Sequence, residues 1–252
     1  MRESGAPFRV FPHNHLDKLA RLLGEADRAQ SQVVVTESVF SMDGDAADLR
    51  GLAELKRRRP FVLLLDEAHA SGVYGEGGAG LAAELGLAGL AEVTVVTLSK
   101  SLGCGGGAVC GSAEFCEAVV NLGRAYIYST GVPPHVAAAA QAAIGVLREE
   151  PRRQVRLREL ALRVRSRLAG GGFDVPAGDS PIMPIVLQSE EAALAAASQM
   201  RDAGLWVVAI RPPTVPRGGS RIRVTMSSEH TDAEVESLLT TVAALRRPDL
   251  SR

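Results

Sequence analysis

Residues 93–107 read VTVVTLSKSLGCGGG, in which a short β-branched run is followed at once by a lone lysine and a glycine-rich segment. The run Val93–Thr97 predicts a buried strand. Lys100 lies just beyond the carboxyl end of this strand, which is where open α/β sheets place their ligands. A lysine in a polar loop is ordinarily only a surface residue, so a functional role for Lys100 depends on which other polar side chains lie near it.

A second predicted strand, Phe61–Leu65, ends in the sequence Asp66-Glu67-Ala68-His69. If the two strands lie in one parallel sheet, their polar ends reach the same crevice. Together they offer the groups that a pyridoxal phosphate site needs. The Lys100 amine can form a Schiff base with the cofactor aldehyde, and Asp66 can keep the pyridine nitrogen protonated. His69 can hydrogen-bond the ring hydroxyl, and Thr97 can hold the phosphate.

The composition sets limits on the function. With 252 residues, of which 46% are hydrophobic and 23% charged, the chain can bury a large core. A net charge of -1 gives no basic face, so we expect no nucleic-acid partner. The chain has 3 cysteines and no CxxC motif, and we interpret the cysteines as small packing residues in a reducing cytosol. We see no signal peptide, and the apolar stretch 136–147 is too short for a bilayer, so we expect a cytoplasmic protein without a membrane partner.

Strand and helix patterns alternate through residues 1–149 at the spacing of parallel βαβ units. The strands are continuously apolar, which indicates that both faces of the sheet are covered. Asn14 is the expected N-cap of a first helix that ends near Gly24. The further elements that we predict here are 32–36, 47–58, 61–65, 81–85, 93–97, 108–111, 113–120 and 135–148.

The pattern changes after residue 149, where a basic helical stretch leads into widely spaced strands. We predict helices at 152–168, 190–203 and 231–245 and strands at 182–187, 205–210 and 221–226. The sequence thus predicts an α/β protein with a mainly parallel sheet. We expect residues 1–149 to form a large domain that binds pyridoxal phosphate, and the family resemblance below implies that this domain is incomplete. We expect residues 150–252 to form a small α+β domain.

Two other motifs are weak. Asp66-Glu67-Ala68-His69 could belong to a helicase-type NTPase, but that site needs a phosphate loop of the form GxxxxGK[ST], and no glycine here precedes a lysine. Residues 103–108 match the GxGxxA dinucleotide fingerprint by letter, but a strand rather than a helix is predicted to follow. Neither match supports a nucleotide site.

Five motifs in a fixed order resemble those of the α-oxoamine synthases, a family of fold-type I pyridoxal phosphate enzymes. They are residues 39–45 (VFSMDGD), 66–69 (DEAH), 97–100 (TLSK), 128–130 (YST), and 211–216 (RPPTVP) together with 221–223 (RIR). The resemblance implies a decarboxylating condensation of an amino acid with an acyl thioester. The pattern is most similar to the family member of biotin synthesis, which implies L-alanine and a pimeloyl group on coenzyme A or acyl carrier protein.

The resemblance also implies roles for single residues. The catalytic group is Lys100, His69 and Asp66, and no metal is implied. The cofactor contacts are Lys100, Asp66, His69, Thr97, Ser41, Ser129 and Thr130. The substrate contacts are Arg223, Thr214 and Ser41, and the arginine is suited to binding a carboxylate through two parallel hydrogen bonds. Ser129 and Thr130 resemble the segment that reaches the cofactor phosphate of a partner subunit, which implies a homodimer.

Several alternatives stay open. Glycine acetyltransferase, aminolevulinate synthase and serine palmitoyltransferase share the fold, and pocket shape cannot be read from the sequence. A non-catalytic dimerisation partner or an inactive fragment is the alternative from another class.

Family members carry a longer N-terminal part with a phosphate-binding loop and a histidine that stacks on the cofactor, and nothing here matches either. We therefore expect these 252 residues alone not to catalyse the condensation. Unpaired sheet edges are expected beside residues 33–36 and 93–97, with exposed apolar surface.

Overall fold

The computed structural model describes residues 4–26 and 30–245 and divides into two compact units. Unit 1 contains Met1–Ser38 and Ala47–Arg148, and unit 2 contains Val39–Ala46 and Glu149–Arg252. The division expected from the sequence, at residues 149 and 150, assigned residues 39–46 to the first domain. By their contacts these residues group with unit 2, because their partners come from residues 165–223.

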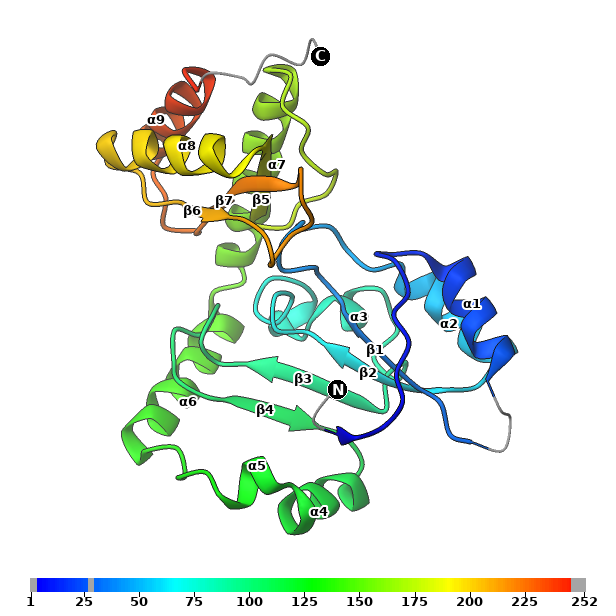
Figure 1. The fold of residues 1–252 in the computed structure, drawn as a ribbon. Coiled ribbons are helices and arrows are strands. Elements are labelled where there is room, and N and C mark those ends of the chain that lie inside the picture. The colour runs from blue at the N-terminus through cyan, green and yellow to red at the C-terminus, as the bar shows by residue number, and fades with distance from the viewer. Residues whose placement is uncertain (1–3, 27–29, 246–252) are drawn as a thin grey trace. The chain divides into compact units, whose positions relative to one another are not determined.

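Unit 1 is built on a four-stranded sheet in the order β1-β2-β3-β4 (Figure 1). The first three strands, β1 (Val33–Glu37), β2 (Val62–Asp66) and β3 (Val93–Thr97), run parallel, and β4 (Gly107–Cys110) is antiparallel to β3. The predicted mainly parallel sheet is confirmed. The expectation of an unpaired edge beside residues 93–97 is wrong, because β4 pairs along that side of β3.

The helices of unit 1 are α1 (Leu16–Glu25), α2 (Leu49–Arg58), the 3-10 turn η2 (Glu76–Gly78), α3 (Leu81–Glu84), α4 (Ala113–Leu122), α5 (Arg124–Ile127) and α6 (Pro134–Glu149). Side chains cap the N-termini of α1, α2 and α4. The N-cap of α1 is His15 rather than Asn14, since the His15 side chain accepts the Lys18 N–H. Asn14 instead accepts the backbone N–H of Asp48, which itself caps α2.

The core of unit 1 includes Leu63 and Leu65 of β2, which are fully buried, and Leu49 and Leu52 of α2, which are also buried. The end of α2 is tied to the sheet by Lys56, whose ammonium lies 2.6 Å from a carboxylate oxygen of Glu92. Glu92 also accepts the backbone N–H of Leu63 at 2.7 Å. Partial burial works against ionisation, but the hydrogen bonds from Lys56 and Leu63 together hold the pKa of Glu92 below its ordinary value.

The side of unit 1 formed by β4 and the helices α4 to α6 is largely exposed to solvent. All four residues of β4 are exposed, no residue of α4 or α5 is buried, and Ala140 is the one buried residue of α6. The expectation that both faces of the sheet are covered is therefore wrong at β4. The exposed apolar surface expected from the sequence is present here, at Val109, Val120, Leu122, Tyr126, Ile127, Tyr128, Val132 and Val146.

Unit 2 packs three helices against a three-stranded antiparallel sheet in the order β5-β7-β6 (Figure 1). Its elements are α7 (Arg152–Gly170), β5 (Ile182–Gln188), α8 (Glu190–Asp202), β6 (Val208–Ile210), β7 (Ser220–Thr225) and α9 (Asp232–Ala243). Met183, Ile185 and Ile222 of the sheet are fully buried in one core with Val164 of α7. Thr231 caps α9 as predicted, in a reciprocal capping box with Glu234.

The three cysteines are free. Their interpretation as packing residues is wrong, because Cys110 is exposed and Cys104 and Cys116 are only half-buried. None of the described helices combines the length and the apolar character needed to cross a lipid bilayer.

Candidate active site

The ends of β2 and β3 form a candidate cofactor site within unit 1. The strands are neighbours and parallel, with Asp66 in register with Val95, so their carboxyl ends meet at one edge of the sheet. The ladder continues past Asp66, since the Glu67 N–H donates to Val95 O at 2.8 Å. Asp66 is half-buried, and its Oδ1 accepts the Ala68 N–H at 2.8 Å, which fixes the carboxylate at the start of the turn.

A side-chain hydrogen bond ties the two loops beyond these strands together. The Ser101 hydroxyl donates a hydrogen bond to Ser71 O at 2.7 Å. Ser101 directly follows Lys100, and Ser71 lies two residues after His69. The approach is tight, because a Cβ on Gly72 (φ +82°) would lie 2.3 Å from the Ser101 Oγ. The structure therefore brings the lysine loop against the turn that carries His69, as the sequence predicted for the two strand ends.

Lys100 is exposed, and its ammonium has no hydrogen-bond or ion-pair partner within the described parts of the chain. Thr97 is half-buried at the last position of β3. Its hydroxyl lies 2.8 Å from the Ser99 Oγ and 3.3 Å from Gly106 O. The glycine-rich segment therefore folds back onto Thr97 and leaves the lysine amine directed to solvent, where it can react.

Glu67 is a buried carboxylate that the sequence analysis gave no role. It is 2% exposed and accepts three hydrogen bonds, from the Ser38 hydroxyl at 2.6 Å and from the N–H groups of Leu81 and Ala82 at 3.0 and 2.9 Å. It therefore joins the end of β1 to the start of α3 directly beside Asp66. In the sequence, the position of Glu67 between the predicted site residues Asp66 and His69 was the one indication that it has a role.

We expect Glu67→Gln to lower the free energy of unfolding by about 2–4 kcal/mol, because the amide nitrogen must face an N–H or O–H donor in the core. Urea unfolding followed by circular dichroism measures the change. Glu76→Gln is the matched control, since Glu76 is exposed, and it should change stability by less than about 0.5 kcal/mol. If Glu67→Gln were as stable as the original chain, the carboxylate would not be an anchor of this turn.

A separate group of predicted site residues lies within unit 2, on the loop 39–46 and strand β7. Arg223 donates from Nη1 to Ser41 O at 2.9 Å, and its Nε is buried without a hydrogen-bond partner in the described structure. Arg221 is 8% exposed and donates from Nη1 to the Asp43 carboxylate at 2.5 Å. The two arginines share one face of β7, as predicted, but within residues 4–26 and 30–245 only Arg221 has a carboxylate partner.

The other predicted residues lie on the surface of their units. Thr214 is exposed in the turn after the cis Pro212-Pro213 peptide bond, and its N–H donates to Arg211 O. Ser129 and Thr130 are exposed after α5, and in the described structure neither hydrogen-bonds to Lys100 or Asp66. Their predicted role in a partner subunit stays a prediction.

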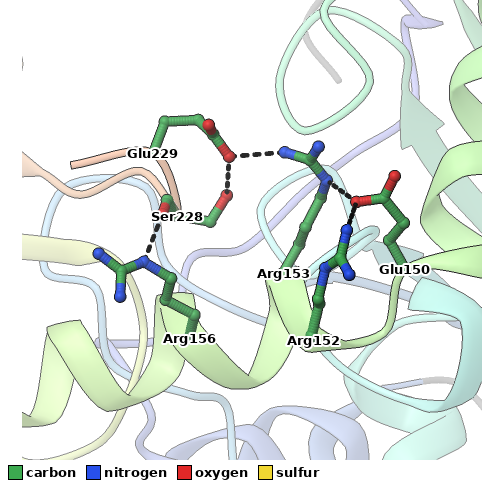
Figure 2. A pocket seen from close by; sticks show the side chains of 6 residues that line it. All are labelled: Glu150, Arg152, Arg153, Arg156, Ser228 and Glu229. Atoms are coloured by element: carbon green, nitrogen blue, oxygen red, sulfur yellow. Dashed lines mark hydrogen bonds and ion pairs between the residues drawn. The ribbon is translucent and has the colours of Figure 1, made fainter. Parts of the chain in front are cut away.

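One surface depression of the described structure lies apart from these residues. It lies in unit 2 between the start of α7 and the turn before α9 (Figure 2). Its side chains engage one another: Arg153 bridges Glu150 and Glu229, and Arg156 donates to Ser228 O. The hydrogen bonds from Arg152 and Arg153 lower the pKa of Glu150. The depression is an ion-pair network that holds two segments together.

The chain matches one protein-family model and is similar to proteins of known name. Residues 1–242 match the family model described as aminotransferase class I and II. The chain is similar to an 8-amino-7-oxononanoate synthase of Anaeromyxobacter dehalogenans (strain 2CP-C), with 47% identity over 233 residues. That alignment covers 92% of this chain and 58% of the relative, so the chain spans less than two thirds of the relative's length.

Two solved structures are similar to the chain. One is a serine palmitoyltransferase from S. paucimobilis with a bound PLP–myriocin aldimine, at a TM-score of 0.88 and 32% identity over 92% of this chain and 59% of that one. The other is an 8-amino-7-oxononanoate synthase from Francisella tularensis, at a TM-score of 0.83 and 25% identity, covering 96% of this chain and 69% of that one.

Proposed function

This chain belongs to the aminotransferase class I and II family, and from that premise we propose that it acts as an α-oxoamine synthase with pyridoxal phosphate as cofactor. The fold is the fold-type I architecture expected from the sequence. One observation carries the proposal. Lys100, which has no partner among the described residues, follows β3, and Asp66 ends the adjacent parallel strand β2. The Ser101–Ser71 hydrogen bond joins the loops that follow these two strands.

The groups at this edge fit the cofactor by their chemistry. When bound, pyridoxal phosphate supplies an electron-withdrawing ring that stabilises negative charge on the carbon beside the substrate nitrogen. Lys100 supplies the amine that attaches it and later moves a proton, and the ionised Asp66 holds a proton at the ring nitrogen. His69 donates to or accepts from the ring hydroxyl, and the Thr97 hydroxyl contributes to holding the phosphate.

We propose that the amino-acid substrate is bound by Arg223, with Ser41 and Thr214 as further contacts. A carboxylate can take two parallel hydrogen bonds from a guanidinium group. Arg221 is the poorer candidate because Asp43 already neutralises it. The buried, unused Nε of Arg223 supports its assignment, since a donor left unsatisfied costs free energy that a bound carboxylate recovers.

The proposed reaction is the decarboxylative condensation of L-alanine with a pimeloyl thioester, carried by coenzyme A or acyl carrier protein, which gives 8-amino-7-oxononanoate. The similarity to the Anaeromyxobacter protein supports this choice of substrates. Glycine with an acetyl thioester is the alternative pair in the same reaction class.

We also propose that the chain assembles as a homodimer in which Ser129 and Thr130 serve the cofactor phosphate of the partner. The exposed apolar side chains of β4, α4 and α5 support this proposal, since a patch of this kind marks an interaction site. Ile127→Asp should raise the monomer fraction in sedimentation velocity. An unchanged distribution of species would argue against this face as the interface.

The function is tested in a chimera in which this chain replaces the aligned part of the Anaeromyxobacter relative. With L-alanine and a pimeloyl thioester we expect release of free thiol, and Lys100→Ala in the chimera should abolish it. The 252-residue chain alone, assayed in parallel, tests the expectation that it does not turn over. Preference for glycine and an acetyl thioester would replace the proposed substrates with the alternative pair.

A further inference from the structure

The loop 39–46 lies in the sequence between β1 and α2 of unit 1 but belongs by its contacts to unit 2. It is closed on itself. Val39 and Ala46 form an isolated antiparallel bridge, the Phe40 N–H donates to Asp45 O at 2.9 Å, and the Gly44 N–H donates to Phe40 O at 2.8 Å. Ser41, a proposed substrate contact, is carried on this small closed loop.

Three arginines of unit 2 donate to consecutive positions of the loop. Arg223 reaches Ser41 O at 2.9 Å. Arg221 reaches Met42 O at 3.3 Å and the Asp43 carboxylate at 2.5 Å. Arg165 of α7 reaches Gly44 O at 3.4 Å. The loop backbone from residue 41 to residue 44 is therefore held along its whole length.

Arg165 also fixes the surface on which the loop rests. It is 5% exposed and donates from Nη2 to Ser180 O at 3.0 Å and to Ile182 O at 2.6 Å, at the start of β5. Gly44 (φ +67°) lies so close to this strand that a Cβ there would be 2.1 Å from Ile182 O. One guanidinium group thus binds both the loop and the strand end beneath it.

We propose that Arg165 and Arg221 are positioning residues, which fix the loop 39–46 on unit 2 so that Ser41 and Arg223 act as one preformed site. The claim that Ser41 and Arg223 bind the substrate together rests on the proposed function. The claim that Arg165 and Arg221 fix the loop does not depend on it. Arg221 and Arg223 lie on one face of β7 but have different proposed roles: Arg221 pairs with Asp43 and holds the loop, whereas Arg223 binds the substrate.

Amide hydrogen exchange of the chain, without cofactor or substrate, tests the loop. Arg221→Met should speed exchange of the Phe40 and Gly44 amides by about tenfold or more, because these amides open with the loop, and should leave α8 and α9 unchanged. Arg221→Lys should restore part of the protection, since an ammonium can still pair with Asp43. Arg165→Lys should give a smaller acceleration at the same amides.

Asp43→Asn provides a second route that leaves both arginine side chains in place and removes only the charge that pairs with Arg221, at an Asp43 side chain that is 38% exposed. It should speed the same amides and add little in the Arg221→Met background, as expected for two partners of one interaction. Arg156→Met is the matched control, since Arg156 also lies on α7 and donates to carbonyl groups, but to Ser228 and His230. If Arg221→Met and Asp43→Asn both left the loop amides at their original rates, the proposal would be overturned.

Titration of the cofactor-loaded chain with L-alanine tests the positioning. Arg221→Met should weaken L-alanine binding several-fold while the cofactor stays attached to Lys100. Faster loop exchange with unchanged L-alanine affinity would reduce Arg221 to a structural residue and overturn the positioning role. If the original chain bound no L-alanine, the proposed function would fail, and the exchange data alone would decide on the loop.

Discussion

Borohydride reduction of the chain in the presence of pyridoxal phosphate is expected to attach the pyridoxyl group to Lys100. The chain contains the three lysines Lys18, Lys56 and Lys100, so peptide mapping can account for every lysine amine and for the N-terminal amine. Lys56 is held by Glu92 and by Leu90 O, each at 2.6 Å, whereas the Lys100 amine has no such partner in the described residues. Reactive amines of this kind are the ones that form Schiff bases.

Lys100→Ala should remove nearly all of the specific label. Lys18 is the internal control for random modification, because it lies on α1 and outside the predicted site. Lys18→Ala should leave the labelling of Lys100 unchanged. Equal labelling of Lys18 and Lys100 at limiting cofactor would falsify the assignment of Lys100 as the cofactor lysine.

Arg223→Ala is expected to weaken binding of L-alanine by about 2–5 kcal/mol, the usual effect of removing one partner of a buried charged contact. That corresponds to a loss of affinity on the order of 30-fold to several thousand-fold. The cofactor should stay bound, since Arg223 lies on β7 of unit 2 and the cofactor residues Asp66 and Lys100 lie in unit 1. Calorimetric titration of the cofactor-loaded chain measures the affinity, and absorbance reports the cofactor.

Arg211→Ala is the matched control for the loss of one positive charge. Arg211 is exposed in the same unit and reaches Glu190 only at 3.9 Å, so its removal should change L-alanine binding little. If Arg223→Ala bound L-alanine as well as the original chain, Arg223 would be structural. Arg221 would then be the next candidate, and its bond to Asp43 would have to open for the substrate.

The sequence by itself determined those parts of the molecule that depend on local patterns. The β-branched run at residues 93–97 and the apolar run at 61–65 predicted two strands of one parallel sheet, because continuously apolar strands are typical of sheets that are covered on both faces. The polar groups after them, Asp66 and Lys100, followed from the rule that parallel strands end at one edge. The cap at Thr231 was likewise readable, since its partner Glu234 is three residues away.

Only the tertiary structure decided which unit holds the loop with Ser41. The sequence placed residues 39–46 with their neighbours β1 and α2, yet they group with unit 2, because the Asp43 partner, Arg221, lies 178 residues further along the chain. The sequence likewise did not predict that Glu67 and Arg165 each join distant segments through hydrogen bonds. A buried charge is stable only where distant groups supply its hydrogen bonds, and a linear pattern of residue types does not record which distant groups meet.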